Sequence, residues 1–283
     1  MVRNGLRTGR PRQGGRWCPV LLVAWLAACA SQVPPAGQAG PVALVVVTPG
    51  LDRSAFRPLA QAFEDKGIET WTAWIPPDAS WPADGAALEA STWIRAAARA
   101  AGAPGRPTAL VGHGPGATLA LLAAPGVADA VVALGPILGP PGTRVGEWLA
   151  ALPVPEGGVD LATPLAWNGH DVASLLLGTH VPPLGPLPAP LARDWQRWIT
   201  EGPPLDPREV TCPVWVAAGA RDRLAPVESI RRPADAFPNA TFVRFGLLRF
   251  DRHDPGSADL LAERAVRRTA ARWLRSTLDG RDG

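Results

Sequence analysis

TALVGHGPGATLALL, residues 108–122, is the stretch that decides the fold. It opens with an apolar run short enough for a buried strand, passes through alternating glycines, and ends in sequence rich in alanine and leucine. This order predicts a strand, a tight turn and a helix. The residue in the middle of the turn is Gly114.

Alternating strand and helix patterns surround this stretch. The continuous β-branched run at 42–47 is typical of a strand buried on both faces of a parallel sheet. Further patterns predict strands at 68–74, 128–134, 212–218 and 240–245, and helices at 55–63, 85–101 and 260–278. The alternation predicts a doubly wound, mostly parallel α/β sheet with right-handed crossovers.

The strand, turn and helix at 108–122 resemble the nucleophile elbow of the α/β-hydrolase superfamily of esterase- and lipase-like proteins. That family places a serine in the middle of Gly-x-Ser-x-Gly at such a turn. The resemblance covers residues 41–279, and it implies one α/β-hydrolase-fold domain over that range. Residues 136–208 are dense in proline and glycine, and the resemblance makes them a cap or lid insertion. The alternative for the insertion is a partly disordered excursion.

The resemblance also implies site residues, in the family's order of elbow, acid and histidine. Asp222 falls at the acid position and His253 at the histidine position. Gly114 stands at the nucleophile position and has no hydroxyl. Pro115 follows it and has no N–H, although the oxyanion hole of the family uses the amide at that place. The amide of Leu51, in the turn after the first strand, is the remaining oxyanion position.

The same motif allows other interpretations. Gly112, Gly114 and Ala117 also satisfy the dinucleotide pattern Gly-x-Gly-x-x-Gly/Ala. That pattern needs an acid about twenty residues on, at the end of the next strand, where this chain has Leu-Gly-Pro at 134–136. Thr118, one turn into the helix, is no convincing substitute nucleophile. We therefore expect no dinucleotide and no other cofactor.

The N-terminus predicts export. Residues 1–16 carry five arginines and no acid, and 17–28 are mostly apolar but too few to span a bilayer as a helix, so 1–28 is predicted to be a signal peptide. Its end, Leu-Ala-Ala-Cys at 26–29, resembles a bacterial lipobox. This implies a lipidated Cys29, a flexible tether over 29–40 and a place in the cell envelope. An ordinary signal peptide and an uncleaved anchor remain alternatives.

The residue after the cysteine is Ala30 and not aspartate, which by resemblance to such lipoproteins favours the outer membrane over the inner one. Removing the five signal arginines from the formal charge of +3 leaves −2, so nucleic acid is not the expected partner. Cys212 opens an apolar strand and is expected to be a small buried residue rather than a reactive thiol. His170 and Asp171 lack a third partner at metal-ligand spacing, so no metal is expected.

Two functional hypotheses follow. The favoured one is a membrane-anchored α/β-hydrolase-fold lipoprotein without serine-hydrolase activity, which binds an apolar small molecule or an envelope protein. The alternative is a residual or altered esterase- or lipase-like hydrolase, in which Asp222 and His253 activate a water in the space vacated at Gly114.

Overall fold

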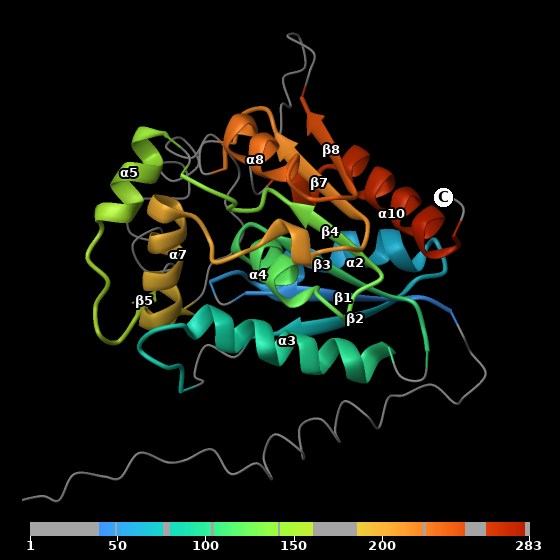
Figure 1. The fold of residues 1–283 in the computed structure, drawn as a ribbon, viewed down its shortest axis with the longest axis horizontal. Coiled ribbons are helices and arrows are strands. Elements are labelled where there is room, and N and C mark those ends of the chain that lie inside the picture. Colours follow the sequence, from blue (N-terminus) through green and yellow to red (C-terminus); the bar gives the residue numbers. More distant parts are fainter. Residues whose placement is uncertain are drawn as a thin grey trace, which may run out of the picture. The chain divides into compact units, whose positions relative to one another are not determined.

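The computed structural model describes residues 40–48, 50–75, 80–102, 105–140, 142–160, 186–222, 225–246 and 259–280. A six-stranded sheet forms its centre, with every neighbouring pair parallel and the order β2-β1-β3-β4-β7-β8 (Figure 1). The strands are β1 Val42–Val47, β2 Glu69–Trp74, β3 Thr108–His113, β4 Ala130–Leu134, β7 Val214–Gly219 and β8 Ala240–Phe245. The predicted doubly wound parallel sheet is confirmed.

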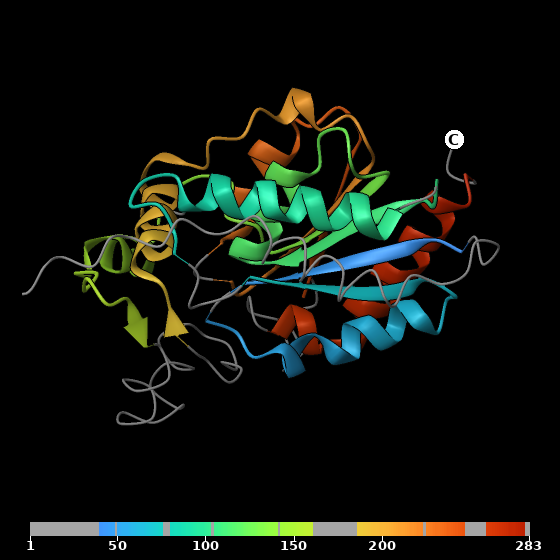
Figure 2. The ribbon, with the colours of Figure 1, turned by 90° about the horizontal axis from the view of Figure 1, so that it is seen from below.

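Helices cover both faces of the sheet, as Figure 2 shows. The helices are, on one face, α3 Ala86–Gly102, α4 Pro115–Ala123 and α8 Val227–Ala234, and on the other, α2 Arg57–Glu64, α9 Asp259–Ala262 and α10 Arg264–Leu278. Each face has its own cluster of buried apolar side chains. Because both faces are covered, β1, β3, β4 and β7 are buried along their whole length, which explains their continuous apolar sequence.

The predicted elements agree with the structure along most of the chain, and the differences are local. The helix expected at 55–63 begins with a 3-10 turn, η1 Arg53–Phe56, capped by the Asp52 carboxylate, which accepts from the Ser54 amide at 2.7 Å. The helix expected at 260–278 is divided into α9 and α10. Glu263 interrupts it and caps α10, because its side chain accepts from the Ala265 amide.

The chain between β4 and β7 contains the stretch predicted as a cap. Its described elements are α5 Arg144–Ala151, β5 Val159–Asp160, β6 Pro186–Leu187, α7 Ala189–Glu201 and η2 Pro207–Glu209. The two short strands pair antiparallel, and α5 packs against α7. Figures 1 and 2 both place α5 and α7 together beyond one end of the sheet. The 136–208 boundaries of a cap remain a prediction.

A carboxylate on α7 joins this inserted chain to the sheet's own helix α3. Asp194 is buried, and its Oδ2 accepts a hydrogen bond from the Ala87 amide at 2.7 Å. Arg197 donates to its other oxygen. The first amides of a helix have no partner within the helix, and Gly85, just before α3, has no side chain to offer. Asp194 therefore caps α3 from a position 107 residues away.

We expect Asp194→Ala to destabilise the fold by about 1 to 3 kcal/mol, because it leaves a buried amide without an acceptor and Arg197 without its nearest carboxylate. Urea unfolding followed by circular dichroism measures the change. Asp206→Ala is the matched control, since Asp206 caps only the exposed 3-10 turn η2. Equal losses from the two variants would contradict the assigned role of Asp194.

Candidate active site

The strand order reverses between β1 and β3, because β2 lies on one side of β1 and β3 on the other. In open α/β sheets, ligands bind beyond the carboxyl ends of the strands at such a reversal. Thr48 directly follows β1 at this edge, and Gly114 directly follows β3. The topology therefore brings the turn singled out by the sequence to the place where a ligand is expected.

Gly114 has a backbone conformation that other residues rarely adopt, with φ 54° and ψ −128°. Its amide donates to the Leu134 carbonyl at 2.8 Å, and its carbonyl accepts from the Ala117 amide at 3.0 Å as α4 begins. A Cβ atom added at Gly114 would meet no atom of the described residues within 4 Å. The turn thus keeps a sharp strand-to-helix geometry and leaves room for a side chain that is not there.

The flanking glycines are required by the close approach of strand and helix. A Cβ on Gly112 would lie 2.3 Å from the carbonyl oxygen of Gly116, well inside contact distance. A Cβ on Gly116 would lie 3.0 Å from the carbonyl oxygen of Val46 in β1. These two positions need glycine for space, whereas Gly114 needs it for its backbone angles.

Side chains on and beside α4 hold the elbow helix in place. Thr118 is fully buried, and its hydroxyl donates to the Ile137 carbonyl at 2.9 Å and accepts from the Ile137 amide at 3.0 Å. At the other end of α4, the Arg95 guanidinium donates to the carbonyls of Leu122 and Ala123. Because both hydrogen-bonding roles of its hydroxyl are used, Thr118 has a structural function and is not a spare nucleophile.

The predicted oxyanion positions offer few amides. Pro115 is the first residue of α4 and has no N–H. The Leu51 amide donates to the Thr48 carbonyl at 3.4 Å, a long hydrogen bond that closes the turn after β1. Thr48 is not among the predicted site residues, yet its buried hydroxyl has no hydrogen-bond partner among the described residues. The available signal was a polar residue directly after the first buried strand.

Asp222 lies three residues beyond β7, at the same edge of the sheet, and is 5% exposed. Its Oδ1 accepts from the Ala225 amide at 2.8 Å, and its own amide donates to the Gly219 carbonyl at 3.1 Å. These bonds fix the carboxylate in a tight turn. His253 and Cys29 lie outside the described residues, so the predicted pairing of Asp222 with His253 stays a prediction.

Solved structures similar to this chain include esterases and lipases. Est1E from Butyrivibrio proteoclasticus has a TM-score of 0.55 over 87% of this chain and 91% of that chain, at 15% identity. A membrane phospholipase A described as a bacterial virulence factor has a TM-score of 0.53 over 94% and 93%, at 19% identity. An esterase from Thermogutta terrifontis has a TM-score of 0.52 over 84% and 90%, at 19% identity.

The chain has the α/β-hydrolase fold. At sequence identities this low, the similarity to these structures shows the fold and nothing about activity. No protein-family model matches the chain, and no curated protein sequence matches it.

Two other groups at or near the strands of this α/β-hydrolase fold are structural. His113, the last residue of β3, is 5% exposed and meets the ring of Phe56 edge-on, with centroids 6.5 Å apart. Cys212 is only partly buried, not fully as expected, but its burial raises the pKa of the thiol to about 11, so the thiol stays protonated at neutral pH. Within the described ranges, no three side chains of the metal-ligating types gather as a metal site would require.

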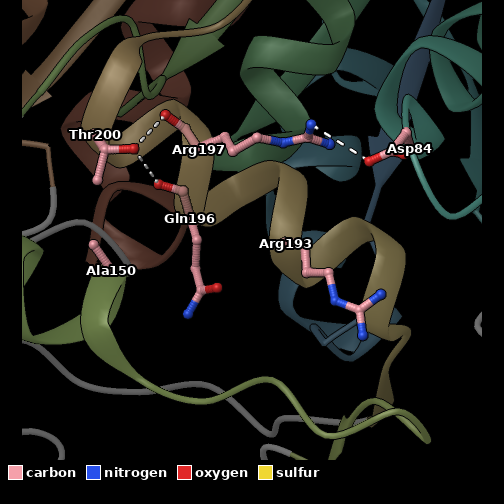
Figure 3. Close-up of a pocket in the computed structure, with 6 residues that line it drawn as sticks. All are labelled: Asp84, Ala150, Arg193, Gln196, Arg197 and Thr200. Atoms are coloured by element: carbon pink, nitrogen blue, oxygen red, sulfur yellow. Dashed lines mark hydrogen bonds and ion pairs between the residues drawn. The ribbon is translucent and has the colours of Figure 1, made fainter.

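A depression of about 380 Å³ lies beside α7, lined by Asp84, Ala150, Arg193, Gln196, Arg197 and Thr200 (Figure 3). Among the described residues of the predicted site, which are Leu51, Gly114, Pro115 and Asp222, none lines it. Arg197 is already paired with Asp194, and its guanidinium nitrogen lies 3.6 Å from an Asp84 carboxylate oxygen. The Arg193 side chain points away from Asp84, as Figure 3 shows. The depression is therefore separate from the elbow of the α/β-hydrolase fold, and two carboxylates offset its best-placed cation.

Proposed function

We propose that the protein is a lipid-anchored α/β-hydrolase-fold protein of the cell envelope that lacks serine-hydrolase turnover and acts by binding an apolar small molecule or an envelope protein. Gly114 occupies the nucleophile position in this proposal. The supporting observation is the backbone at Gly114, which has the sharp turn and the open space of an elbow but no hydroxyl.

The energetics support the absence of turnover. Loss of the serine from a comparable triad lowers kcat by about a millionfold, since no acyl-enzyme forms. Removal of one oxyanion donor from intact machinery costs a further hundred- to thousandfold, and Pro115 removes the donor that follows the nucleophile position. With both groups missing, ordinary acyl transfer loses its covalent step and much of the stabilisation of its transition state.

A binding role is supported by the polar atom left at the carboxyl edge. The Thr48 hydroxyl is buried without a partner among the described residues, and such a group costs about 1 to 3 kcal/mol. Its methyl group lies 3.3 Å from the Cβ position on Gly116, so the side chain sits against the first turn of α4. A ligand oxygen that reached this hydroxyl would recover the cost.

The alternative function is an altered hydrolase, and the placement of Asp222 favours it. A buried carboxylate that accepts from the Ala225 amide, on a backbone fixed by a hydrogen bond to the Gly219 carbonyl, is suited to orient a histidine. With His253 as general base, a water in the space at Gly114 would take the place of the serine hydroxyl.

The envelope location rests on the sequence at the N-terminus. The lipobox-like end of the signal and the proposed lipid on Cys29 support anchoring, and Ala30 supports the outer membrane. No helix within the described ranges has the length and apolar character to cross a bilayer.

A fluorophosphonate probe and a panel of short-chain esters test the proposed function. We expect no covalent labelling of the wild-type protein and no ester hydrolysis above the rate without protein, because position 114 at the elbow is glycine and offers no serine to phosphonylate. Labelling at the elbow would overturn the proposal. Ester hydrolysis without labelling, lost in both Asp222→Ala and His253→Ala, would instead establish the water-activating alternative.

A further inference from the structure

The last helix of the domain carries an unusual charge for this chain. The sequence of α10 is RAVRRTAARWLRSTL, with five arginines and no acid. The chain after the predicted signal has a formal charge of −2, so the positive charge on α10 stands against an acidic balance elsewhere. Blocks of one sign on a folded surface attract partners of the opposite sign.

Three of these arginines form one stripe. Arg264, Arg268 and Arg272 are spaced four residues apart, so they follow one another along the same face of the helix. All three side chains are exposed, and within the described part of the chain none forms an ion pair. The opposite face of α10 is buried against the sheet through Val266, Ala270, Ala271 and Leu274. The stripe therefore faces away from the core.

The neighbouring helix on the same face does not cancel this charge. α2 packs against α10, and α2 with the turn that follows it exposes two cations and two carboxylates, which balance one another: Arg57, Glu64, Asp65 and Lys66. Arg275, at the end of α10, pairs with Asp279 at 2.9 Å and is not part of the stripe. The three stripe arginines and Arg267, whose guanidinium donates to the Leu261 carbonyl, outnumber Glu263, the cap of α10, so this face keeps an excess of positive charge.

The end of the predicted tether lies beside the same helix. A Cβ on Gly40, the first described residue, would lie 3.8 Å from the Gly67 carbonyl oxygen, and Arg275 donates to that oxygen at 3.3 Å. Arg106 fixes the position further, since it donates to the Gly40 carbonyl at 2.9 Å and pairs with Glu69. Figures 1 and 2 both show the start of β1 and the C-terminal end of α10 at the same side of the sheet.

We propose that the α10 stripe is a second, protein-based membrane contact, which binds the phosphates of anionic phospholipids and holds the α2/α10 face against the bilayer. Arginine suits this role because its planar guanidinium binds phosphate through two hydrogen bonds. The proposal gains from the proposed lipid on Cys29. Twelve residues, Cys29 to Gly40, span at most about 40 Å. A lipid on Cys29 would thus keep α10 close to the bilayer and raise its effective concentration there.

The test measures how strongly the protein binds to vesicles when its own predicted lipid-attachment site, Cys29, has been removed. Full chains with Cys29→Ala are mixed with phosphatidylethanolamine–phosphatidylglycerol vesicles and with phosphatidylcholine vesicles. One variant adds Arg264→Gln, Arg268→Gln and Arg272→Gln, and the matched control adds Arg208→Gln, Arg231→Gln and Arg232→Gln. Arg231 and Arg232 lie on α8, over the other face of the sheet, and Arg208 lies in η2. Both variants lose three positive charges, so they differ only in where on the surface these charges are removed.

We expect the stripe variant to bind the anionic vesicles about a hundredfold more weakly, at several-fold per arginine, with little change on the neutral vesicles. The control variant should change by less than about threefold, and raising the salt should reduce its binding toward that of the stripe variant. The phosphatidylcholine arm measures what the apolar N-terminus contributes.

The proposed role of the stripe would be overturned if both triple variants lost vesicle binding equally. It would also be overturned if the Cys29→Ala chain bound equally to both kinds of vesicle. Duplex DNA is included as a competitor, and an effect of the stripe on DNA binding alone would also overturn it. The anchor is scored separately, by membrane fractionation and acyl labelling of the wild type and Cys29→Ala in cells. Unchanged fractionation with no acyl label would reject the lipid on Cys29 and leave the vesicle result standing.

Discussion

Gly114→Ser alone should restore little ester hydrolysis, whereas Gly114→Ser combined with Pro115→Met should restore roughly a hundredfold more. The serine supplies a hydroxyl at a turn that already has the sharp geometry and free space to hold it. The second change supplies an N–H at the first position of α4. That N–H has no partner within the helix, because the helix begins with the Ala117 amide donating to the Gly114 carbonyl.

Initial rates on short-chain esters, with the fluorophosphonate probe counting reactive sites, measure the repair. Pro115→Met alone is the matched control and should stay inactive, since it restores the donor without the nucleophile. Adding His253→Ala to the repaired protein should remove the recovered activity. If the wild type already matches the double variant, and does so with His253 removed, the interpretation of Gly114 and Pro115 is wrong.

Gly112→Ala should prevent stable folding, with a loss of at least about 4 kcal/mol. Its new Cβ would lie 2.3 Å from the Gly116 carbonyl oxygen and 2.6 Å from the Ala117 Cα. Both atoms belong to the backbone of α4, so relief requires the strand and the helix to separate. Gly114→Ala meets no atom and should lose only about 1 to 2 kcal/mol, from its positive φ.

Urea unfolding measures the free energy of unfolding of each variant. Where a variant does not fold, the yield of soluble protein is compared instead. Gly157→Ala is the control, because an added Cβ there meets nothing and its backbone is ordinary. It should change the free energy of unfolding by no more than about 0.5 kcal/mol. Comparable stability of Gly112→Ala and Gly114→Ala would show that β3 and α4 are not as close as the structure has them.

Local pattern was enough to predict the sheet and the elbow. The β-branched run of β1 predicted a strand with the bounds Val42–Val47, and the glycine-rich break in 108–122 predicted the turn at Gly114. Both signals lie within a few residues of the feature they describe. Position after β7 likewise placed Asp222 at the carboxyl edge, where the structure has it buried.

The elements that went unpredicted have weak local signals. The sequence of α8, VESIRRPA, carries three charges and a proline, so only Ile230 and Ala234 mark its buried face. In α5 and α7 the helical spacing is hidden among prolines and glycines. The sequence around Glu263 predicted one continuous helix. The break there depends on a single side chain, that of Glu263, which caps α10.

Contacts between distant segments left no trace in local sequence. The hydrogen bond from Ala87 to Asp194 joins residues 107 positions apart, and neither residue is unusual in its own neighbourhood. The burial of the Thr48 hydroxyl depends on how β1 meets α4. Such features depend on the packed structure, and only the structure shows them.

The Asp194 contact also reports on the movement of α7 relative to α3. If α7 swings outward, the Ala87 amide and the Asp194 carboxylate part, at a free energy on the order of 1 to 3 kcal/mol. Because α7 also buries Leu191 and Trp198, exposing them would cost several kcal/mol more, and the open form would hold fewer than about one molecule in two hundred. Hydrogen exchange at the single amide of Ala87 would accordingly report how often α7 leaves the core.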